Sequence, residues 1–311
     1  MPAPKATWVD RPQSSRLRRA LFQVHLWTGI VLGVYVVVIS VSGSVAVFRR
    51  EVNFALIPRT VETVGETRLD RSALEAALAP RYPGYRLVRI SEPRRPERPV
   101  QVALERDGIE ISRLVDPYTG RDLGSPFPAG VRVMEWIVRL HDDLLAGETG
   151  RKLNGAAGVL CTALVLTGAV IWWPGRRRWR YALTMRRGRG APRLSWQLHS
   201  VLGFWCFALL LGWAVTGVYF AFPQPFEAVM DGLDSDPSDL SRPGEGLLLA
   251  LIKLHFGRFG GLGIRFTWAL LGLVPAVLFV TGFTMWWRRV VRRRWLRDRT
   301  APGSAIRAPA S

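Results

Sequence analysis

The residues of this chain with the clearest potential for chemistry are its four histidines, because each lies at the end of a different apolar segment. They are His25, His141, His199 and His255. A neutral imidazole is a good iron ligand, and a polar ring at a membrane edge is costly unless it is coordinated or hydrogen-bonded. The two cysteines, Cys161 and Cys206, exclude a disulfide framework, a four-thiolate metal site and a C-x-x-C-H haem-attachment motif. Any cofactor must therefore be held by other ligands.

The histidines stand in a duplicated frame. His25 and His199 are each followed by glycine after four and after 18 residues, at Gly29 and Gly43 and at Gly203 and Gly217. His141 and His255 are each followed by glycine after 6, 17 and 27 residues and by a tryptophan pair after 31–32. The members of this second set are Gly147, Gly158, Gly168 and Trp172–Trp173, matched by Gly261, Gly272, Gly282 and Trp286–Trp287, with identical pairs Thr167–Gly168 and Thr281–Gly282. The membrane part is therefore predicted to be two copies of a two-helix unit.

The elements that must position the histidines are apolar segments of membrane-spanning length. Four segments approach or exceed the roughly 20 residues that a helix needs to cross about 30 Å of hydrocarbon. They cover residues 24–48, 155–173, 199–222 and 266–287. The first is too long for a removable signal peptide and has no small-residue cleavage site, so it is expected to remain as an anchor. A hydrophobic content of 49% with runs of this length excludes intrinsic disorder and disfavours a soluble globule.

The formal net charge of +19 has a topological explanation. Residues 1–23, 174–198 and 288–311 together hold 21 Lys and Arg but only two acids, Asp10 and Asp298, so the whole excess lies on one side of the spans. By the positive-inside rule this side is cytoplasmic, and both termini lie there. The runs RRRWR and RRVVRRR are interpreted as topology determinants that touch anionic lipid, in preference to a nucleic-acid-binding surface.

This topology sorts the histidines into one pair at each face. His25 and His199 begin outward-going helices at the cytoplasmic face, whereas His141 and His255 precede inward-going helices at the outer face. The 18 residues from His25 to Gly43 rise roughly 27 Å in a straight helix, so the two pairs occupy opposite leaflets and cannot share one metal. Facing imidazoles on neighbouring helices suit a bis-histidine b-type haem in a four-helix bundle. We therefore expect two non-covalent b-type haems, with the four histidines as their iron ligands and no catalytic residue beyond them.

Other readings of the same residues remain open. Zinc and copper are disfavoured because the extra Cys, Met or carboxylate ligands expected for them are absent nearby. The repeated glycines allow either a haem or a neighbouring helix to approach the backbone closely. The tryptophan pairs are interpreted as an interfacial aromatic belt in preference to an electron relay. Basic residues near the outer pair either neutralise haem propionates, attract an anionic substrate or form a charged juxtamembrane rim. They are Arg151, Lys152, Lys253, Arg258 and Arg265.

Residues 49–140 are predicted to form a small α+β domain inserted between the first two spans, on the side opposite the cytoplasm. A helical stretch at 69–85 precedes the strand-like runs RLVRIS, VQVALE and IEISRLV and the turn DPYTG at 116–120. This pattern predicts a helix packed on a short antiparallel sheet, with EPRRPERP (92–99) as a solvated hairpin tip. The domain contains no His and no Cys, so its expected role is scaffolding or binding.

The order of several motifs carries a family resemblance. They are VHLWTGIVLG (24–33), VSGSVAVFRRE (41–51), LHDDLLAGETGRKLNGAAG (140–158), WQLHSVLGFW (196–205) and KLHFGRFGG (253–261). Over almost its whole length the chain resembles the PepSY-associated transmembrane family, whose members include inner-membrane ferric-siderophore reductases of Gram-negative bacteria. The resemblance implies a PepSY-like periplasmic domain, a place in the bacterial inner membrane, and electron transfer outward to a ferric siderophore or similar chelate, which releases the iron.

The resulting expectation is a haem-dependent transmembrane oxidoreductase that serves iron acquisition. No G-x-G-x-x-G stands at a strand-to-helix junction, so the electron donor is expected to be a separate cytoplasmic reductase or a quinol. The alternative is a non-enzymatic, membrane-anchored PepSY module that binds or inhibits a periplasmic partner. An iron-chelate permease is disfavoured, because the sequence shows neither intramembrane charges nor broken helices.

The expected fold class is a mainly α membrane protein with a four-helix transmembrane bundle. Its predicted order is a cytoplasmic N-terminus (1–23), a span (24–48), the periplasmic domain (49–140), a lead-in with the second span (141–173), a basic cytoplasmic loop (174–198), a third span (199–222), a periplasmic loop with lead-in (223–265), a fourth span (266–287) and a basic cytoplasmic tail (288–311).

Overall fold

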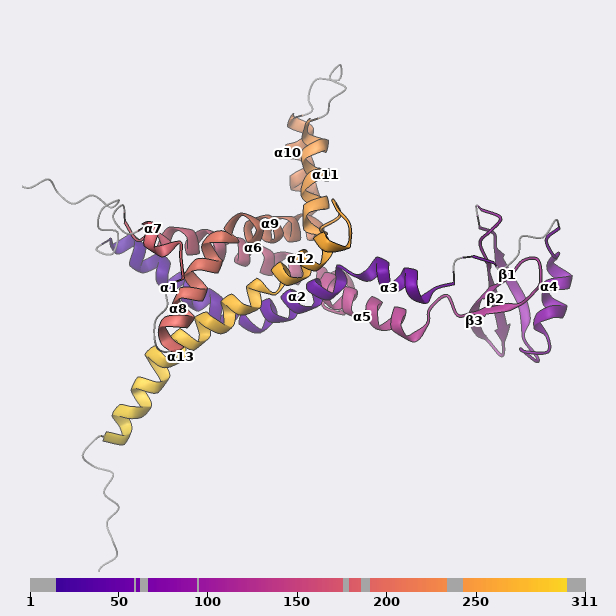
Figure 1. The fold of residues 1–311 in the computed structure, drawn as a ribbon, viewed down its shortest axis with the longest axis horizontal. Coiled ribbons are helices and arrows are strands. Elements are labelled where there is room, and N and C mark those ends of the chain that lie inside the picture. Colours follow the sequence, from indigo (N-terminus) through magenta and orange to yellow (C-terminus); the bar gives the residue numbers. More distant parts are fainter. Residues whose placement is uncertain are drawn as a thin grey trace, which may run out of the picture. The chain divides into compact units, whose positions relative to one another are not determined.

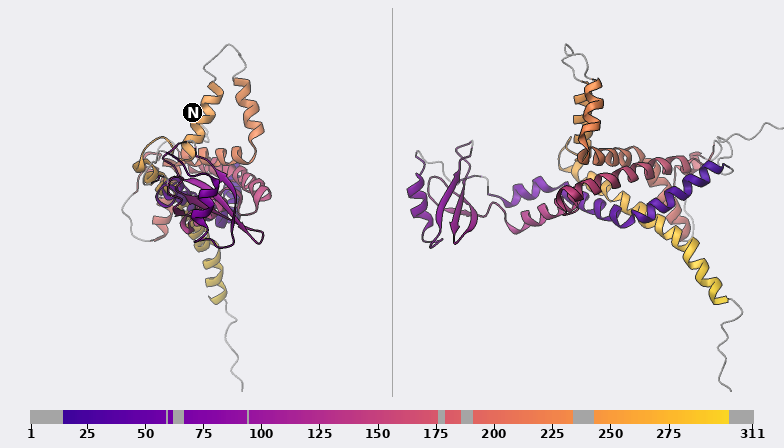
Figure 2. Two further views of the ribbon diagram at one scale, coloured as in Figure 1. Left: turned by 90° about the vertical axis from the view of Figure 1, so that its right-hand side faces the viewer. Right: turned by 180° about the vertical axis from the view of Figure 1, so that it is seen from behind.

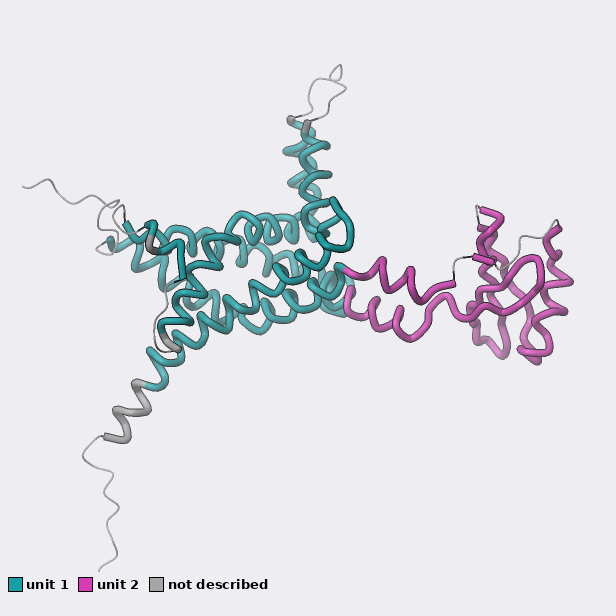
Figure 3. The backbone as a smooth tube through the Cα atoms, in the orientation of Figure 1, with its two compact units in different colours: residues 1–47, 139–311 teal, residues 48–138 magenta. Residues whose placement is uncertain are grey.

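The computed structural model of the chain describes residues 15–58, 60–61, 67–93, 95–175, 179–185, 191–233 and 243–300. It divides into two compact units, a membrane unit of Met1–Val47 with Arg139–Ser311 and a small unit of Phe48–Val138 (Figure 3). Parts of the predicted basic segments (1–14, 176–178, 186–190 and 301–311) and residue 94 of the predicted hairpin tip lie outside the described residues.

The membrane unit is built from long apolar helices, drawn in Figure 1. They are α1 (Arg16–Val31), α2 (Gly33–Ala46), α6 (Gly147–Trp172), α8 (Ala191–Trp205), α9 (Phe207–Ala221), α12 (Leu262–Gly272) and α13 (Val274–Thr300). Two stretches are long and apolar enough to cross a bilayer, Gly147–Trp172 and Leu262–Arg292, and α1 with α2 and α8 with α9 would bring the number to four if each bent pair is one span. Exposed aliphatic side chains such as Val31 and Leu270 suit a lipid environment. The chain is thus a mainly helical membrane protein with two to four candidate spans.

Two of the spans are bent, which the sequence did not predict. The axis turns by 63° between α1 and α2 at Leu32, and by 68° between α8 and α9 at Cys206. Leu32 and Cys206 occupy matching positions of the predicted repeat, and each follows a glycine by three residues. A glycine inside a helix lowers its stability by about 1 kcal/mol relative to alanine, which makes both places weak points of the helix. At the first bend the ring of Phe279 occupies the space that a Cβ at Gly33 would need.

The helices of the predicted repeat pack against one another in corresponding ways. Helix α1 lies against α6, and α8 lies against α13. Helix α2 lies against α12 and α13, while α6 runs beside α9, as the right-hand view of Figure 2 shows for α6 and α9. Each bent pair therefore contacts both of the straight spans.

Shorter helices connect these spans. They are α5 (Ala129–Asp143), α7 (Trp179–Ala182), α10 (Pro223–Leu233) and α11 (Pro243–His255). Residues 223–265, predicted as a loop with a lead-in, thus contain two helices that lie side by side (Figures 1 and 2). Each of them begins with a proline, whose fixed φ and missing N–H suit the first position of a helix. The apolar run LLLALI continues α11 up to its last residue, His255.

The small unit contains the predicted helix and antiparallel sheet. Besides α3 (Arg49–Leu56), it has α4 (Arg71–Leu78), β1 (Arg86–Ser91), β2 (Val100–Arg106), β3 (Ile109–Val115) and β4 (Asp122–Gly124). The four strands form an antiparallel sheet in the order β1-β2-β3-β4. Helix α4 ends at Leu78, seven residues before the predicted end, and the three-residue strand β4 was not predicted because it is too short to show alternation.

Aliphatic side chains from α4 and three strands form the core of the small unit. They are Leu74, Leu78, Leu87, Val100, Val102, Leu104 and Val115. Asp70 caps α4 by accepting a hydrogen bond from the amide of Ala73 at 2.8 Å. The predicted turn after β3 is present: Asp116 accepts from the amide of Tyr118 at 2.9 Å, and Gly120 adopts a φ of 70°.

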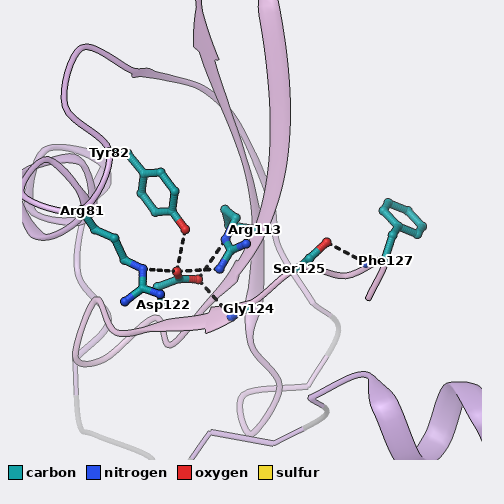
Figure 4. Close-up of polar contacts among 7 residues, drawn as sticks. All are labelled: Arg81, Tyr82, Arg113, Asp122, Gly124, Ser125 and Phe127. Atoms are coloured by element: carbon teal, nitrogen blue, oxygen red, sulfur yellow. Dashed lines mark hydrogen bonds and ion pairs between the residues drawn. The ribbon is translucent and has the colours of Figure 1, made fainter. Parts of the chain in front are cut away.

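A buried carboxylate ties the last strand to the rest of the small unit (Figure 4). Asp122, whose side chain is 4% exposed, accepts from Arg113 Nη2 at 2.7 Å, from the hydroxyl of Tyr82 at 2.6 Å and from Arg81 Nε at 2.9 Å. Burial by itself would raise the pKa of Asp122, but the bonds from Arg113 and Tyr82 outweigh it and hold this pKa below its ordinary value. The carboxylate is therefore a structural tie between β3, β4 and the segment after α4.

Candidate functional site

The inner histidine pair consists of His25 on α1 and His199 on α8. Their ring centroids lie 6.3 Å apart with an interplanar angle of 88°. His25 Nδ1 lies 3.0 Å from the carbonyl oxygen of Leu164 on α6, and His199 Nδ1 lies 2.9 Å from that of Leu278 on α13. Each ring is also close to a threonine hydroxyl, of Thr167 at 3.3 Å and Thr281 at 3.1 Å. The two halves thus hold their inner histidine in the same way.

The outer pair consists of His141 on α5 and His255 at the end of α11. Their ring centroids lie 6.5 Å apart with an interplanar angle of 63°. His141 Nδ1 lies 3.0 Å from the carbonyl oxygen of Ile39 and 3.3 Å from the hydroxyl of Ser42. His255 Nδ1 has one hydrogen-bond partner among the described residues, the hydroxyl of Thr216 at 2.5 Å. Ser42 and Thr216 occupy matching positions of the repeat, each directly before the second glycine of its span.

The separations within both pairs fit two rings that share one metal ion. A metal–imidazole nitrogen bond is about 2.0 Å long and the nitrogen lies about 1.2 Å from the ring centre, so two rings on opposite sides of one metal have centroids about 6.4 Å apart. The measured 6.3 Å and 6.5 Å bracket this value. The separation would not depend on the angle between the ring planes, which differs between the pairs, 88° and 63°.

The hydrogen bonds engage Nδ1 of each ring and leave Nε2 available to a ligand. A carbonyl oxygen only accepts hydrogen bonds, so the Nδ1 of His25, His141 and His199 must carry the proton and donate it. The Nε2 of these rings then holds a lone pair, and such a second-layer bond on the far nitrogen is usual for metal-ligating histidine. No residue in the described part of the chain hydrogen-bonds any of the four Nε2 atoms.

Glycines bring several helix backbones close to the imidazoles. A Cβ at Gly168 or Gly282 would lie 3.1 Å or 3.2 Å from Cε1 of the inner histidine on the facing helix, and a Cβ at Gly43 would lie 2.6 Å from Cε1 of His141. The other repeated glycines have different surroundings: Gly29, Gly158, Gly203 and Gly272 face other helices, and Gly217 has open space within 4 Å. Gly43, Gly168 and Gly282 therefore lie at the histidine sites, four others serve helix packing, and Gly217 belongs to neither group.

The ends of the helices that carry the outer pair are held by side chains at matching positions. Asn154 Nδ2 donates to the carbonyl oxygen of His141 at 2.8 Å, and Trp268 Nε1 donates to that of Leu254 at 2.8 Å. Asn154 and Trp268 each stand 13 residues after the outer histidine of their half. Tyr35 on α2 extends the first contact by donating to Asn154 Oδ1 at 2.5 Å. These bonds fix the backbone from which the outer imidazoles project.

The outer histidines lie outside the candidate spans and are held in the neutral form. Burial lowers the pKa of His141, and burial together with the nearby His141 lowers the pKa of His255 to about 3. A neutral imidazole is the form that ligates a metal. Among the described residues no group of three or more His, Cys, Asp or Glu is placed to hold a metal ion. A haem iron needs only two axial protein ligands, so the pairs suit haem better than a bare zinc or copper ion.

The basic residues predicted near the outer pair have varied surroundings. Lys152 pairs with Glu148 at 2.8 Å, and the guanidinium of Arg258 lies 4.4 Å from the ring centroid of Phe256. Arg151 and Lys253 are exposed. These positions fit a charged rim, and none of the contacts singles out one basic residue as an anion site.

The sequence pattern indicated the four histidines as candidate ligands but did not indicate the groups that contact their Nδ1 atoms. Ser42, Thr167, Thr216 and Thr281 carry the hydroxyls close to Nδ1. A signal was present, because each of the four directly precedes a repeated glycine. At Gly43, Gly168 and Gly282 a Cβ would meet the same imidazole ring that the preceding hydroxyl approaches.

Comparisons with known proteins place the chain in a family. The sequence model of the PepSY-associated TM region matches residues 22–246 and 231–289. The chain is also similar to an uncharacterized protein of Pseudomonas aeruginosa, with 33% identity over 84 residues, which are 27% of this chain and 21% of that relative. The matched segment therefore spans about a fifth of the relative's length. The family match covers most of the chain, and the protein belongs to the PepSY-associated transmembrane family.

Proposed function

We propose that the protein is a b-type di-haem electron-transfer protein of the bacterial inner membrane. The observation that carries the proposal is the separation within the two histidine pairs, 6.3 Å and 6.5 Å between ring centroids. Both values would suit two imidazoles that hold one haem iron, and the proton on Nδ1 would leave Nε2 for the metal. Haem, when bound, supplies reversible one-electron chemistry.

In this proposal the chain contributes ligands, spacing and a low dielectric. His25 and His199 form one site, and His141 and His255 form the other. Gly43 lies against the ring of His141 and therefore marks the second site. In a straight helix His25 and Gly43 would lie roughly 27 Å apart, but the 63° bend between α1 and α2 shortens this distance to about 23 Å. The bend thus brings the two ligand pairs nearer to each other than a straight four-helix bundle would.

The proposed topology has four spans in two duplicated halves, with both termini in the cytoplasm. The separation of the +19 charge supports it, because the positive-inside rule assigns the basic segments to the cytoplasm. The small unit, inserted between the first two spans, is then periplasmic. In this orientation His25 and His199 lie near the cytoplasmic face, and the other pair lies near the periplasmic face.

The proposed reaction is the reduction of a periplasmic ferric chelate such as a ferric siderophore. One electron passes from a separate donor, a cytoplasmic reductase or a quinol, to one ferric ion, which becomes ferrous. The softer, less charged ion binds hard oxygen ligands less tightly and is released. Family membership supports this substrate class, and the paired imidazoles support the electron path.

The test is a reduced-minus-oxidised absorption spectrum of the purified full chain, expressed with haem supplied. We expect a low-spin b-type signal with about two haems per chain, and transfer of electrons from the dithionite-reduced protein to a ferric siderophore. His141→Ala should remove about half of the haem signal, and His25→Ala should remove the other half. A control, Thr162→Ala, changes a hydroxyl whose one partner among the described residues is the carbonyl of Gly158 in its own helix, and it should keep both haems.

Other outcomes of this experiment would favour the rival functions. A colourless protein would refute the proposal and favour a membrane-anchored module that binds or inhibits a periplasmic partner. Loss of both haems in His141→Ala, or of neither, would refute the pairing. The bends at Leu32 and Cys206 remove one argument against a chelate permease, so uptake of the chelate into proteoliposomes should be measured as well. We expect no uptake.

A further inference from the structure

Three buried side-chain donors in the described part of the chain have no hydrogen-bond partner. They are Arg18 Nε, Trp172 Nε1 and Trp286 Nε1. Buried polar groups in proteins are almost always paired, so each exception needs an explanation. All three belong to the membrane unit, and all three are N–H groups that can only donate.

The two tryptophans have the same position relative to the inner histidines. Trp172 stands four residues after Gly168, and Trp286 stands four residues after Gly282. Those glycines are the ones whose Cβ would meet the inner imidazoles at 3.1 Å and 3.2 Å. Residues four apart share one helix face, so each indole lies about 6 Å further along the face against which a histidine packs.

Arg18 belongs to the same neighbourhood. Its Nη2 donates to the carbonyl oxygen of Ile171, the residue next to Trp172, at 2.5 Å. Arg18 also precedes His25 by seven residues, two turns of α1, and therefore lies on the histidine's side of that helix. The ring of Trp172 in turn stacks on Phe204 of α8 with centroids 4.3 Å apart, five residues after His199. The donors thus lie on helices that meet around the inner pair.

A simple membrane belt does not account for these indoles. A belt tryptophan directs its N–H to water or lipid headgroups, whereas the N–H groups of Trp172 and Trp286 are enclosed by protein. The neighbouring Trp287 is 48% exposed and provides the contrast. Three donors, one of them on a permanently charged guanidinium, are complementary to a ligand that carries only acceptors and a negative charge.

We propose that Arg18, Trp172 and Trp286 form a carboxylate-binding subsite on the cytoplasmic side of the inner pair, which receives the two propionate groups of a porphyrin. The inference rests on the proposed function and extends it from the iron ligands to the rim of the macrocycle. The duplicated indoles match the two carboxylates of such a ligand. At the outer pair, the described residues contain no buried orphan N–H donor of this kind.

The test uses the full chain carrying His141→Ala, which isolates the inner site, loaded either with haem or with haem dimethyl ester. Trp172→Phe and Trp286→Phe keep an aromatic ring and remove the N–H. We expect each variant to lose haem about tenfold faster to an excess of a haem-scavenging protein, because a hydrogen bond to a charged group is lost. Trp287→Phe, at the exposed neighbouring position, is the matched control and should lose haem at the parent rate.

Loading with haem dimethyl ester tests whether the three donors bind the carboxylates of the porphyrin or other acceptor groups. Haem dimethyl ester should leave the parent protein at least as fast as haem leaves the variants, and the two Phe substitutions should then have no further effect. Ultraviolet resonance Raman bands of the indole N–H should shift on loading with haem and not with the ester. Equal loss rates in the Phe variants and the control would overturn the subsite, as would Phe effects that persist with the ester. A parent protein that binds no haem would instead refute the proposed function.

Discussion

At the scale of single residues, the four histidines differ in how their far nitrogen is held. Three of them donate from Nδ1 to a backbone carbonyl oxygen, at 2.9 to 3.0 Å, and have a hydroxyl as a second neighbour. His255 has the hydroxyl of Thr216, which itself donates to the carbonyl oxygen of Gly212 at 2.7 Å. A hydroxyl can be removed by mutation, whereas a backbone carbonyl cannot. The outer site should therefore be the more sensitive one.

Thr216→Val is expected to weaken haem binding at the outer pair about tenfold or more, because loss of a second-layer partner of a metal-ligating histidine typically costs this much. Thr281→Val removes the equivalent inner hydroxyl but leaves the Leu278 carbonyl, so its effect should be small. Haem titration of both variants and a redox titration of each site are the measurements. Thr216→Ser should restore binding and potential, and equal effects of the two Val variants would contradict this account.

The buried carboxylate of the small unit predicts a pH dependence of stability. The pKa of Asp122 lies below its ordinary value in the folded chain, so its contribution to stability is fully present above the unfolded pKa of about 3.9 and is lost as the pH falls toward the folded pKa. Hydrogen-exchange protection of β2 and β3, corrected for intrinsic rates, should therefore fall below about pH 4. In Asp122→Asn the protection should be lower at neutral pH and should depend much less on pH. An unchanged pH profile in this variant would refute the structural role of the Asp122 carboxylate.

At the scale of elements, close approach between helices depends on where a side chain is missing. Gly43 and Gly217 are matched by the repeat, but a Cβ at Gly43 would lie 2.6 Å from the ring of His141, while Gly217 has nothing within 4 Å. The lead-in helices also differ, since Asn154 holds the end of α5 and Trp268 holds the end of α11. The two halves thus share a frame and differ in their contacts.

Gly43→Ala should displace His141 and reduce haem occupancy of the outer pair, whereas Gly217→Ala should leave it unchanged. Alanine favours a helix over glycine by about 1 kcal/mol, so a loss in the first variant cannot come from helix propensity. Haem content and the outer-site absorption signal are the measurements. Equal occupancy in both variants would show that the backbone of α2 can move aside.

At the scale of the whole molecule, charge and hydrophobicity together set the expected orientation. The basic excess belongs to segments 1–23, 174–198 and 288–311, and the remaining sequence is balanced. The small unit is inserted between the first two proposed spans. Both of its ends therefore lie on the same side of the membrane in that topology. These features favour the proposed topology with four spans.

The orientation can be tested with single cysteines in a background that lacks Cys161 and Cys206. Ser91→Cys, at the exposed end of β1, should react with a membrane-impermeant maleimide in intact spheroplasts. Met185→Cys, which replaces a 50% exposed side chain in the basic segment after α7, should react only after lysis. The reverse pattern would invert the topology and with it the assignment of inner and outer pairs.

The sequence alone determined the features that follow from periodicity and local propensity. Apolar runs predicted the membrane helices, alternation predicted three strands of the small unit, and the repeated His, Gly and Trp positions predicted which halves correspond. The pairing of the histidines was also predicted, because helix direction and length restrict which ends can meet.

Only the tertiary structure decided how closely the rings approach, where the spans bend and which groups hold each imidazole. The 6.3 Å and 6.5 Å separations, the bends at Leu32 and Cys206 and the unpartnered indole N–H groups all depend on contacts between residues far apart in the chain. Such contacts are set by packing between helices, which a linear pattern does not encode, because many side-chain arrangements share the same periodicity.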